Sequence, residues 1–109
     1  MTTTLFSPIQ IGSLELPNRI VMPAMHLNYT MDGKVSPQLI DFYTARARGG
    51  VGLAIVGGMP TLQAAGPFFM PLIKDDSFLP GLTELADAVH EAGGHAGVQL
   101  YDAGAYSHQ

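Results

Sequence analysis

Three short stretches of the sequence hold residue types that could contact a ligand, and each one lies at the end of an expected strand. They are Ala24-Met25-His26, Gly57-Gly58 and the run from Gln99 to Asp102. In the first stretch the side chains are small at Ala24, soft at Met25 and polar at His26, which would suit the edge of a flat ligand. A glycine pair lets a ring or a phosphate approach the backbone, although a simple turn accounts for Gly57-Gly58 equally well. These stretches predict a binding site and leave the ligand open.

Gln99 is the polar residue of an otherwise apolar strand. A buried amide without partners destabilises a protein by about 1–3 kcal/mol, so we expect this amide to bond to backbone or to ligand. Its donor and acceptor lie side by side, which matches the edge of a pyrimidine ring. Tyr101 lies two residues further on and shares the same face of the sheet. His26 and Met25 are weaker signals, because a single histidine usually packs at a rim and a methionine usually packs in a core.

Other kinds of site lack the residues that they need. His90 and His95 superficially resemble a zinc-binding helix pattern, but they are five positions apart and Gly93-Gly94 interrupts the helix. The sequence has no cysteine, which excludes disulfides and thiolate metal sites within these residues. It also has no glycine-rich nucleotide motif and no Ser-His-Asp grouping. We therefore assign neither a metal ligand nor a catalytic residue within this segment.

Alternating strands and helices must position the candidate residues. The spacing predicts a hairpin over 9–16, strands over 20–22, 51–56 and 96–101, and helices from Ser36-Pro37 to Gly49-Gly50 and from Pro80 to Gly93-Gly94. Continuous apolar runs between helices are typical of parallel strands buried on both faces. We expect Gly57-Gly58 to end the second of these strands, before a long loop over 59–78. Ligands of parallel α/β folds bind at the carboxyl ends of strands, where all three stretches lie.

The composition is that of one globular domain without a highly charged partner. The length of 109 residues fits a single domain, and a charged fraction of 13% suits strands that are covered on both sides. A net charge of −4 gives no basic surface for nucleic acid. No apolar run approaches the roughly 20 residues of a membrane span, and the N-terminus lacks the features of a signal peptide. We expect a cytoplasmic protein with no nucleic-acid and no membrane partner.

Three longer stretches resemble the N-terminal part of the NADH:flavin oxidoreductases, within the old yellow enzyme superfamily. They are LFSPIQIGSLELPNRIVMPAMH, FYTARARGGVGLAIVGG and AVHEAGGHAGVQLYDAGAYSHQ, and the likeness runs from about residue 5 to the end. More narrowly, they are similar to the branch of bacterial 2,4-dienoyl-CoA reductases and trimethylamine dehydrogenases. The resemblance implies that residues 1–109 are the N-terminal portion of an FMN-binding (β/α)8 TIM barrel. Residues 9–16 would be its bottom hairpin, and residues 20–109 its first three strands with two helices.

The same resemblance implies which residues hold the cofactor. The residues that would contact FMN are Ala24, Met25 and His26 near its reactive ring, Gly58 through its backbone, and Gln99 at the pyrimidine edge. Arg19, which follows the asparagine of the first strand, is interpreted as structural. One departure concerns the substrate: the family usually has His-x-Gly-Arg after the glutamine strand, where this chain has Asp102-Ala103-Gly104-Ala105. A carboxylate at that corner would repel an anionic substrate.

For the whole protein, the resemblance implies an FMN-dependent oxidoreductase. A hydride would pass from NAD(P)H through the flavin to an activated C=C bond of a small-molecule substrate, such as an enoyl or dienoyl compound. The alternatives are an amine dehydrogenase of the trimethylamine type and a non-catalytic barrel fragment that works as an assembly piece. A complete barrel needs roughly 250 residues, so the proton donor, the flavin phosphate site and any iron–sulfur cluster are expected outside residues 1–109. The expected partner of these three strands is an oligomer or the rest of a barrel.

Overall fold

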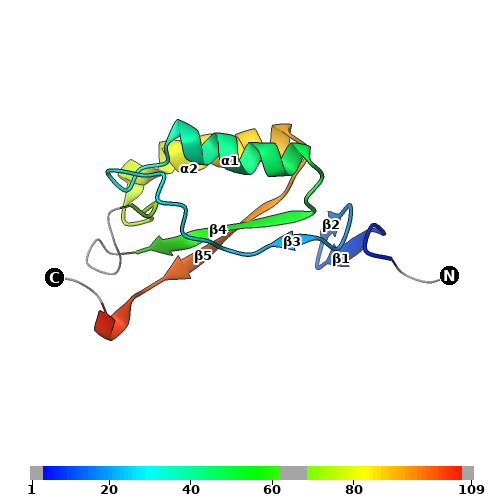
Figure 1. Ribbon diagram of the computed structural model, residues 1–109, viewed down its shortest axis with the longest axis horizontal. Coiled ribbons are helices and arrows are strands. Elements are labelled where there is room, and N and C mark those ends of the chain that lie inside the picture. The colour runs from blue at the N-terminus through cyan, green and yellow to red at the C-terminus, as the bar shows by residue number, and fades with distance from the viewer. Residues whose placement is uncertain (1–3, 62–68, 107–109) are drawn as a thin grey trace.

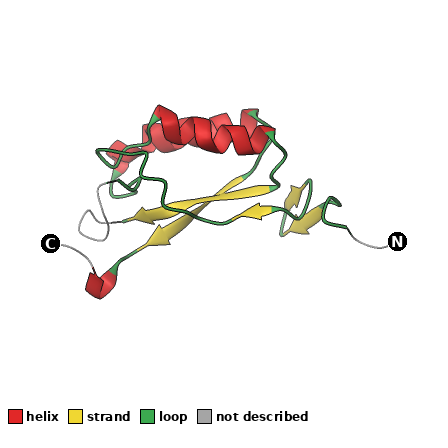
Figure 2. Cartoon of the chain, viewed as in Figure 1, coloured by secondary structure: helices red, strands yellow, loops and turns green. Residues whose placement is uncertain are grey.

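Two helices pack on one face of a three-stranded sheet, and a small hairpin extends from the amino end of that sheet (Figure 1, Figure 2). The structure is a computed structural model that describes residues 4–61 and 69–106. The elements in chain order are β1 (Ile9–Ile11), β2 (Leu14–Leu16), β3 (Val21–Met22), α1 (Pro37–Arg48), β4 (Leu53–Pro60), η2 (Asp76–Phe78), α2 (Leu79–Glu91), β5 (Ala96–Tyr101) and η3 (Gly104–Tyr106).

The sheet is parallel and its strands are neighbours in chain order, β3-β4-β5. Helix α1 connects β3 to β4, and α2 connects β4 to β5. β1 and β2 pair antiparallel as the predicted hairpin. The predicted α/β fold with successive βαβ units is therefore confirmed.

Most element bounds agree with the predictions, and four differ. The structure has β3 beginning at Val21 rather than at residue 20, and α2 beginning at Leu79 rather than at Pro80. The larger difference is in β4, which begins at Leu53 rather than at Val51 and does not end at Gly57-Gly58 but continues to Pro60. The prediction was wrong there because a glycine pair marks a turn and a strand irregularity equally well. Part of the expected loop over 59–78, residues 62–68, lies outside the described residues.

Helix α1 begins and ends through the residues that predicted it. The Ser36 hydroxyl accepts a hydrogen bond from the Leu39 N–H at 3.1 Å, and Pro37 occupies the first helical position. At the other end Gly50 has φ +97°, in the left-handed region that glycine adopts without steric cost. Local sequence signals therefore place this helix.

The core lies between the helices and one face of the sheet. On β4, Ala54, Val56 and Met59 are buried beneath the helices. The residues that cover them are Leu39, Tyr43 and Ala47 of α1, with Leu85 and Val89 of α2. Burial of this apolar surface holds the two layers together.

The opposite sheet face, which we call the open face, is not covered by any described element. Its residues follow from the strand register: Val21 pairs with Leu53, Ile55 pairs with Gly97, and Gln99 follows two positions later. Val21 is 48% exposed and Leu53 and Ile55 are half-buried. The prediction of strands buried on both faces is thus wrong for this chain, because its helices lie on one side (Figure 1).

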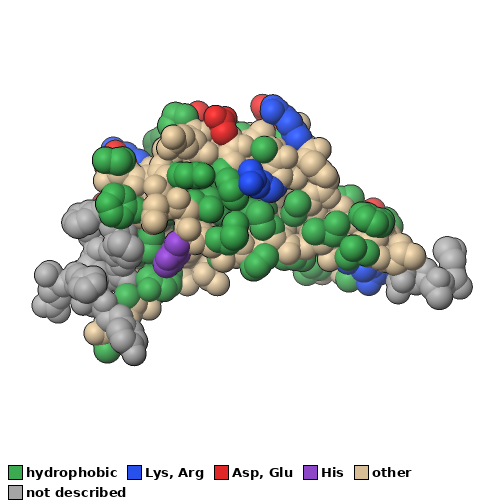
Figure 3. Space-filling view, in the orientation of Figure 1, with side chains coloured by type: hydrophobic (Ala, Val, Ile, Leu, Met, Phe, Trp, Pro, Cys, Tyr) green, Lys and Arg blue, Asp and Glu red, His purple; other side chains and the backbone are tan. Residues whose placement is uncertain are grey.

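A second apolar surface runs beside β5. A groove of about 250 Å³ separates α2 from the edge strand, and its lining includes Met59, Leu82 and Val98. Next to it, Leu100 is 64% exposed although it pairs with the buried Met59. Figure 3 shows hydrophobic side chains spread over much of one face of the molecule, with most charged side chains above them on the helical layer. The strands therefore carry apolar side chains that the described part of the chain leaves exposed.

Asn18 ties the start of the sheet to the end of α1. It is 9% exposed, its Nδ2 donates to the Gly50 carbonyl at 2.6 Å, and its Oδ1 accepts from the Ile20 N–H at 3.0 Å. The neighbouring Arg19 contacts the N-terminal segment instead: its guanidinium donates to the Pro8 carbonyl at 3.3 Å. This contact agrees with the structural interpretation of Arg19.

Residues 1–109 expressed alone are expected to self-associate, because the open face and the groove beside β5 expose strand surface and unpaired edges. Light scattering should give a mass above that of the 11.6 kDa monomer. Leu100→Lys should lower that mass, whereas Thr83→Lys on the exposed side of α2 should not. A monomer that unfolds cooperatively would contradict this expectation.

Candidate functional site

The three candidate stretches lie together at the carboxyl end of the sheet. Ala24-Met25-His26 follows β3, Gly57-Gly58 lies within β4, and Gln99 lies in β5. All three strands run in the same direction, toward the left of Figure 1. Ala24 is half-buried, Gly58 is buried, and Met25, His26 and Gln99 are exposed. The topology thus brings together residues that are far apart in the sequence.

Gly57 and Gly58 form a bulge in β4. Val56 pairs with Val98 and Met59 pairs with Leu100, so β4 carries one more residue than β5 between these two pairs. A Cβ on Gly57 would lie 2.9 Å from the Gln99 Cβ, and a Cβ on Gly58 would lie 2.6 Å from the Tyr101 Cβ. Both separations are shorter than the distance to which two real Cβ atoms approach each other. Packing of β4 on β5 therefore requires glycine at both positions, with or without a ligand.

His26 meets Tyr101 across the end of the sheet. Their ring centroids are 5.8 Å apart and the rings are almost perpendicular, at 87°. This edge-to-face arrangement is favourable for aromatic rings. The contact joins the segment after β3 to the last residue of β5, on either side of Gly58. His26 therefore has a structural partner within the chain, as expected of a rim histidine.

Gln99 is exposed, which differs from the expectation of a buried and bonded amide. Within the described part of the chain, its amide has no hydrogen-bond partner. The open face is uncovered beside β5, and this is the physical reason for the difference. The argument from burial cost does not apply to this chain, but the exposed donor and acceptor remain available to a ligand.

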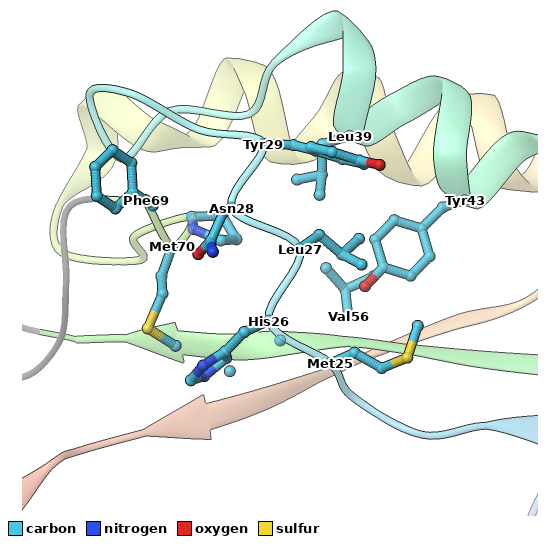
Figure 4. A pocket seen from close by; sticks show the side chains of 13 residues that line it. Met25, His26, Leu27, Asn28, Tyr29, Leu39, Tyr43, Val56, Phe69 and Met70 are labelled. Atoms are coloured by element: carbon cyan, nitrogen blue, oxygen red, sulfur yellow. The ribbon is translucent and has the colours of Figure 1, made fainter.

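A small cavity lies behind these residues, between the sheet and α1 (Figure 4). Its lining includes His26, Leu39, Tyr43, Gly57 and Gly58. The cavity volume is about 10 Å³, near the minimum for one ordered water. A flat ring cannot enter a space of this size, so a ligand of that kind would bind on the exposed side of the strand ends.

Tyr43 is a site residue that the sequence did not single out. It reaches from α1 toward the sheet and is 1% exposed (Figure 4). Burial raises the pKa of its hydroxyl, and a hydrogen bond with the Gly57 backbone opposes part of that rise. The sequence does contain a signal that could have identified Tyr43, because a tyrosine on the buried stripe of a helix needs a partner for its hydroxyl. The sequence does not say which partner.

Asp102 stands beside the site at the end of β5. Its Oδ1 accepts a hydrogen bond from the Gly104 N–H at 2.8 Å, and the residue is exposed.

Among the described residues, no three His, Cys, Asp or Glu side chains are grouped closely enough to hold a metal ion. No helix within 4–61 and 69–106 is long and apolar enough to cross a membrane. The exposed Gln99 amide and the bare backbone of Gly58 suit a flat, hydrogen-bonding ligand.

The chain matches a family of known oxidoreductases over almost all of its length. Residues 4–109 match the model of the NADH:flavin oxidoreductase / NADH oxidase family. A metal reductase of Desulforamulus reducens is 53% identical over 104 residues, which cover 95% of this chain and 16% of that protein. The chain therefore spans about one sixth of the length of this curated relative.

Solved structures with the same arrangement include an old yellow enzyme from Pichia sp. AKU4542. The TM-score is 0.82 at 28% identity, with 90% of this chain and 26% of that chain covered. A complex of 2-naphthoyl-CoA reductase with 2-naphthoyl-CoA gives a TM-score of 0.89 at 31% identity, covering 95% of this chain and 16% of that chain. The hairpin, three strands and two helices thus have the fold of the N-terminal part of a (β/α)8 barrel, as the resemblance implied.

Raising the pH above 10 should destabilise the protein more than it destabilises a Tyr43→Phe variant. Because burial raises the folded-state pKa of Tyr43 above the unfolded value of 10.0, the unfolded state loses its proton first. The stability that this difference contributes is complete below the unfolded pKa and is lost as the pH rises through the folded pKa. Thermal unfolding at about pH 8 and about pH 11 checks this. Equal slopes for the wild type and Tyr43→Phe would contradict the expectation.

Proposed function

We propose that the whole protein, meaning the polypeptide that contains residues 1–109, is an FMN-dependent oxidoreductase, because this chain belongs to the NADH:flavin oxidoreductase / NADH oxidase family. The observation that carries the proposal is the meeting of His26, Gly58 and Gln99 at the carboxyl ends of adjacent parallel strands. Barrel enzymes bind their ligands at this end. When bound, FMN supplies hydride transfer from NAD(P)H to an activated C=C bond.

The residues present fit the isoalloxazine group of FMN. Gln99 offers an unpaired amide whose donor and acceptor suit the pyrimidine edge. Gly58 has no side chain, so its backbone can lie next to a ring. The remaining proposed contacts, near the reactive part of the ring, are made by Ala24, Met25 and His26. Met25 is 41% exposed and adds a soft apolar surface.

The proposed substrate class is an enoyl or dienoyl compound, including coenzyme A thioesters. Support comes from the solved 2-naphthoyl-CoA reductase, whose complex contains a CoA thioester. Asp102 limits this choice, because a carboxylate beside the strand ends disfavours a negatively charged group next to it. The part of the substrate near β5 is therefore uncharged. Any iron–sulfur cluster of the whole protein would need cysteines outside this chain, which contains none.

Asp102 also favours a second candidate, the oxidation of an amine. An exposed carboxylate attracts a protonated amine, which is the kind of substrate that a dehydrogenase of the trimethylamine type would oxidise. Steady-state assays separate the two candidates: turnover of enoyl-CoA with NAD(P)H supports the first, and reduction of the flavin by a tertiary amine supports the second.

The purified whole protein should be yellow. Heat denaturation should release a cofactor that is identified as FMN by its absorption, its fluorescence and its mass. The physical reason is the fit of the strand-end residues to the ring. A correctly folded, colourless protein that does not take up added FMN would overturn the proposal.

Gln99→Leu should weaken FMN binding and leave the fold intact. Loss of the amide leaves the pyrimidine edge without its partner, a change of about 1–3 kcal/mol, or roughly one to two decades in Kd. Flavin fluorescence titration of the apoprotein measures the Kd, and thermal unfolding checks the fold. Gln10→Leu in the hairpin also removes an exposed amide, far from the strand ends, and serves as the control. Equal Kd values for the wild type and Gln99→Leu would show that Gln99 does not contact the flavin.

A further inference from the structure

We propose that Tyr101 is a positioning residue for the cofactor: its ring holds the His26 imidazole in place beside the backbone of Gly58. This inference rests on the proposed function and deepens it, because two of the proposed flavin contacts, His26 and Gly58, lie against Tyr101 in the structure. Tyr101 would thus act on the flavin through His26, and not by contact with the reacting atoms.

The Tyr101 side chain packs directly on the bare backbone of Gly58. A Cβ on Gly58 would lie 2.6 Å from the Tyr101 Cβ, 3.0 Å from its Cγ and 3.2 Å from its Cδ2. The tyrosine therefore occupies the space that a side chain at position 58 would fill. Tyr101 is half-buried, and its backbone pairs with Pro60 at the end of the sheet. A ring packed in this way cannot move toward β4.

The His26 imidazole has no comparable support of its own. It is exposed, and within the described residues it makes no hydrogen bond. Its ring contact is with Tyr101, at a centroid separation of 5.8 Å and an interplanar angle of 87°. A side chain without a partner samples several rotamers, and a ligand that binds against it must fix one of them at a cost in entropy. The edge-to-face contact favours one orientation of the imidazole before the cofactor binds.

Tyr101 lies where three strands contribute to the site. His26 follows β3, Gly58 belongs to β4, and Tyr101 ends β5, two residues after Gln99 and on the same face. In Figure 4 the His26 ring projects over the ends of β4 and β5, in agreement with its contact to Tyr101. Loss of the Tyr101 ring would release His26 without removing any of the proposed flavin contacts.

Two substitutions separate the ring of Tyr101 from its hydroxyl. Tyr101→Phe keeps the ring and its edge-to-face contact, whereas Tyr101→Leu keeps an apolar side chain against Gly58 and removes the contact. Tyr101→Met is a second, more adaptable substitute that gives the same test if the leucine variant does not fold. The matched control is Phe42 of α1, a half-buried ring in an edge-to-face pair with Tyr29 at a centroid separation of 6.0 Å. Phe42→Leu removes a contact of the same kind that involves no proposed flavin contact.

The first measurement is a double-mutant cycle on the whole protein, with the FMN Kd obtained by fluorescence titration of the apoprotein. Tyr101→Leu should raise the Kd about three- to tenfold, because binding must then fix a free imidazole. Tyr101→Phe and Phe42→Leu should stay within about twofold of the wild type. In a His26→Ala background, Tyr101→Leu should change the Kd by less than about twofold, since the ring that it positions is gone.

Two outcomes of the cycle would overturn the inference. An equal effect of Tyr101→Leu in both backgrounds would show that Tyr101 acts on the flavin without His26. A Kd for Tyr101→Phe as high as that for Tyr101→Leu would show that the hydroxyl matters and not the ring contact.

The second measurement is the visible absorption spectrum of the bound flavin at saturating FMN. These bands respond to the protein groups beside the ring, so Tyr101→Leu and His26→Ala should shift them in the same direction. Tyr101→Phe and Phe42→Leu should leave them unchanged. Wild-type bands in Tyr101→Leu would overturn the positioning role, because the contact with His26 would then be structural only.

The two proposals fail in different ways. A wild-type protein that binds no FMN overturns the proposed function and, with it, any role of Tyr101 toward the cofactor. Normal FMN binding by the wild type, with the same Kd and the same bands in Tyr101→Leu, leaves the proposed function standing and overturns the positioning role alone.

Discussion

The close approach of β4 to β5 at Gly57-Gly58 is the constraint on which the candidate site depends. A side chain at either position would overlap Gln99 or Tyr101, so the two strands can pair here only through bare backbone. The extra residue of the bulge changes the direction of β4 just before it ends. Behind the bulge Tyr43 occupies the core, and in front of it His26 contacts Tyr101. Glycine in this strand thus determines how three polar side chains are arranged.

Local signals predicted most of the elements, because the physics of those elements is local. Ser36-Pro37 specifies a helix start through one hydroxyl and one fixed φ angle, and both features are found in the structure. The alternation around Gly12-Ser13 specifies a hairpin in the same way. The meeting of the strand ends could also be predicted, since parallel strands joined by helices must present their carboxyl ends together.

The features that could not be predicted depend on contacts between distant parts of the chain. Gly57-Gly58 carries the same signal in a turn and in a bulge, and only pairing with β5 decides between them. Gln99 has the pattern of a buried residue, but its exposure depends on what covers the open face. Tyr43 and Gly57 line the same cavity although they belong to a helix and to the following strand, and no spacing rule specifies this. Each of these uncertainties is located at the candidate site.

The strand order β3-β4-β5 has a consequence for how the chain is made on the ribosome. Each strand pairs with the strand synthesised just before it, so no pairing has to wait for a distant segment. Strands β4 and β5 begin 43 residues apart, at Leu53 and Ala96, and at about 5–20 residues per second the edge of β4 stays unpaired for roughly 2–9 seconds. During that interval Gly57-Gly58 makes the unpaired edge a poorer template for a second nascent chain, because glycine weakens a regular strand. The two glycines that let the finished strands pair thus also disfavour wrong pairing of the growing chain.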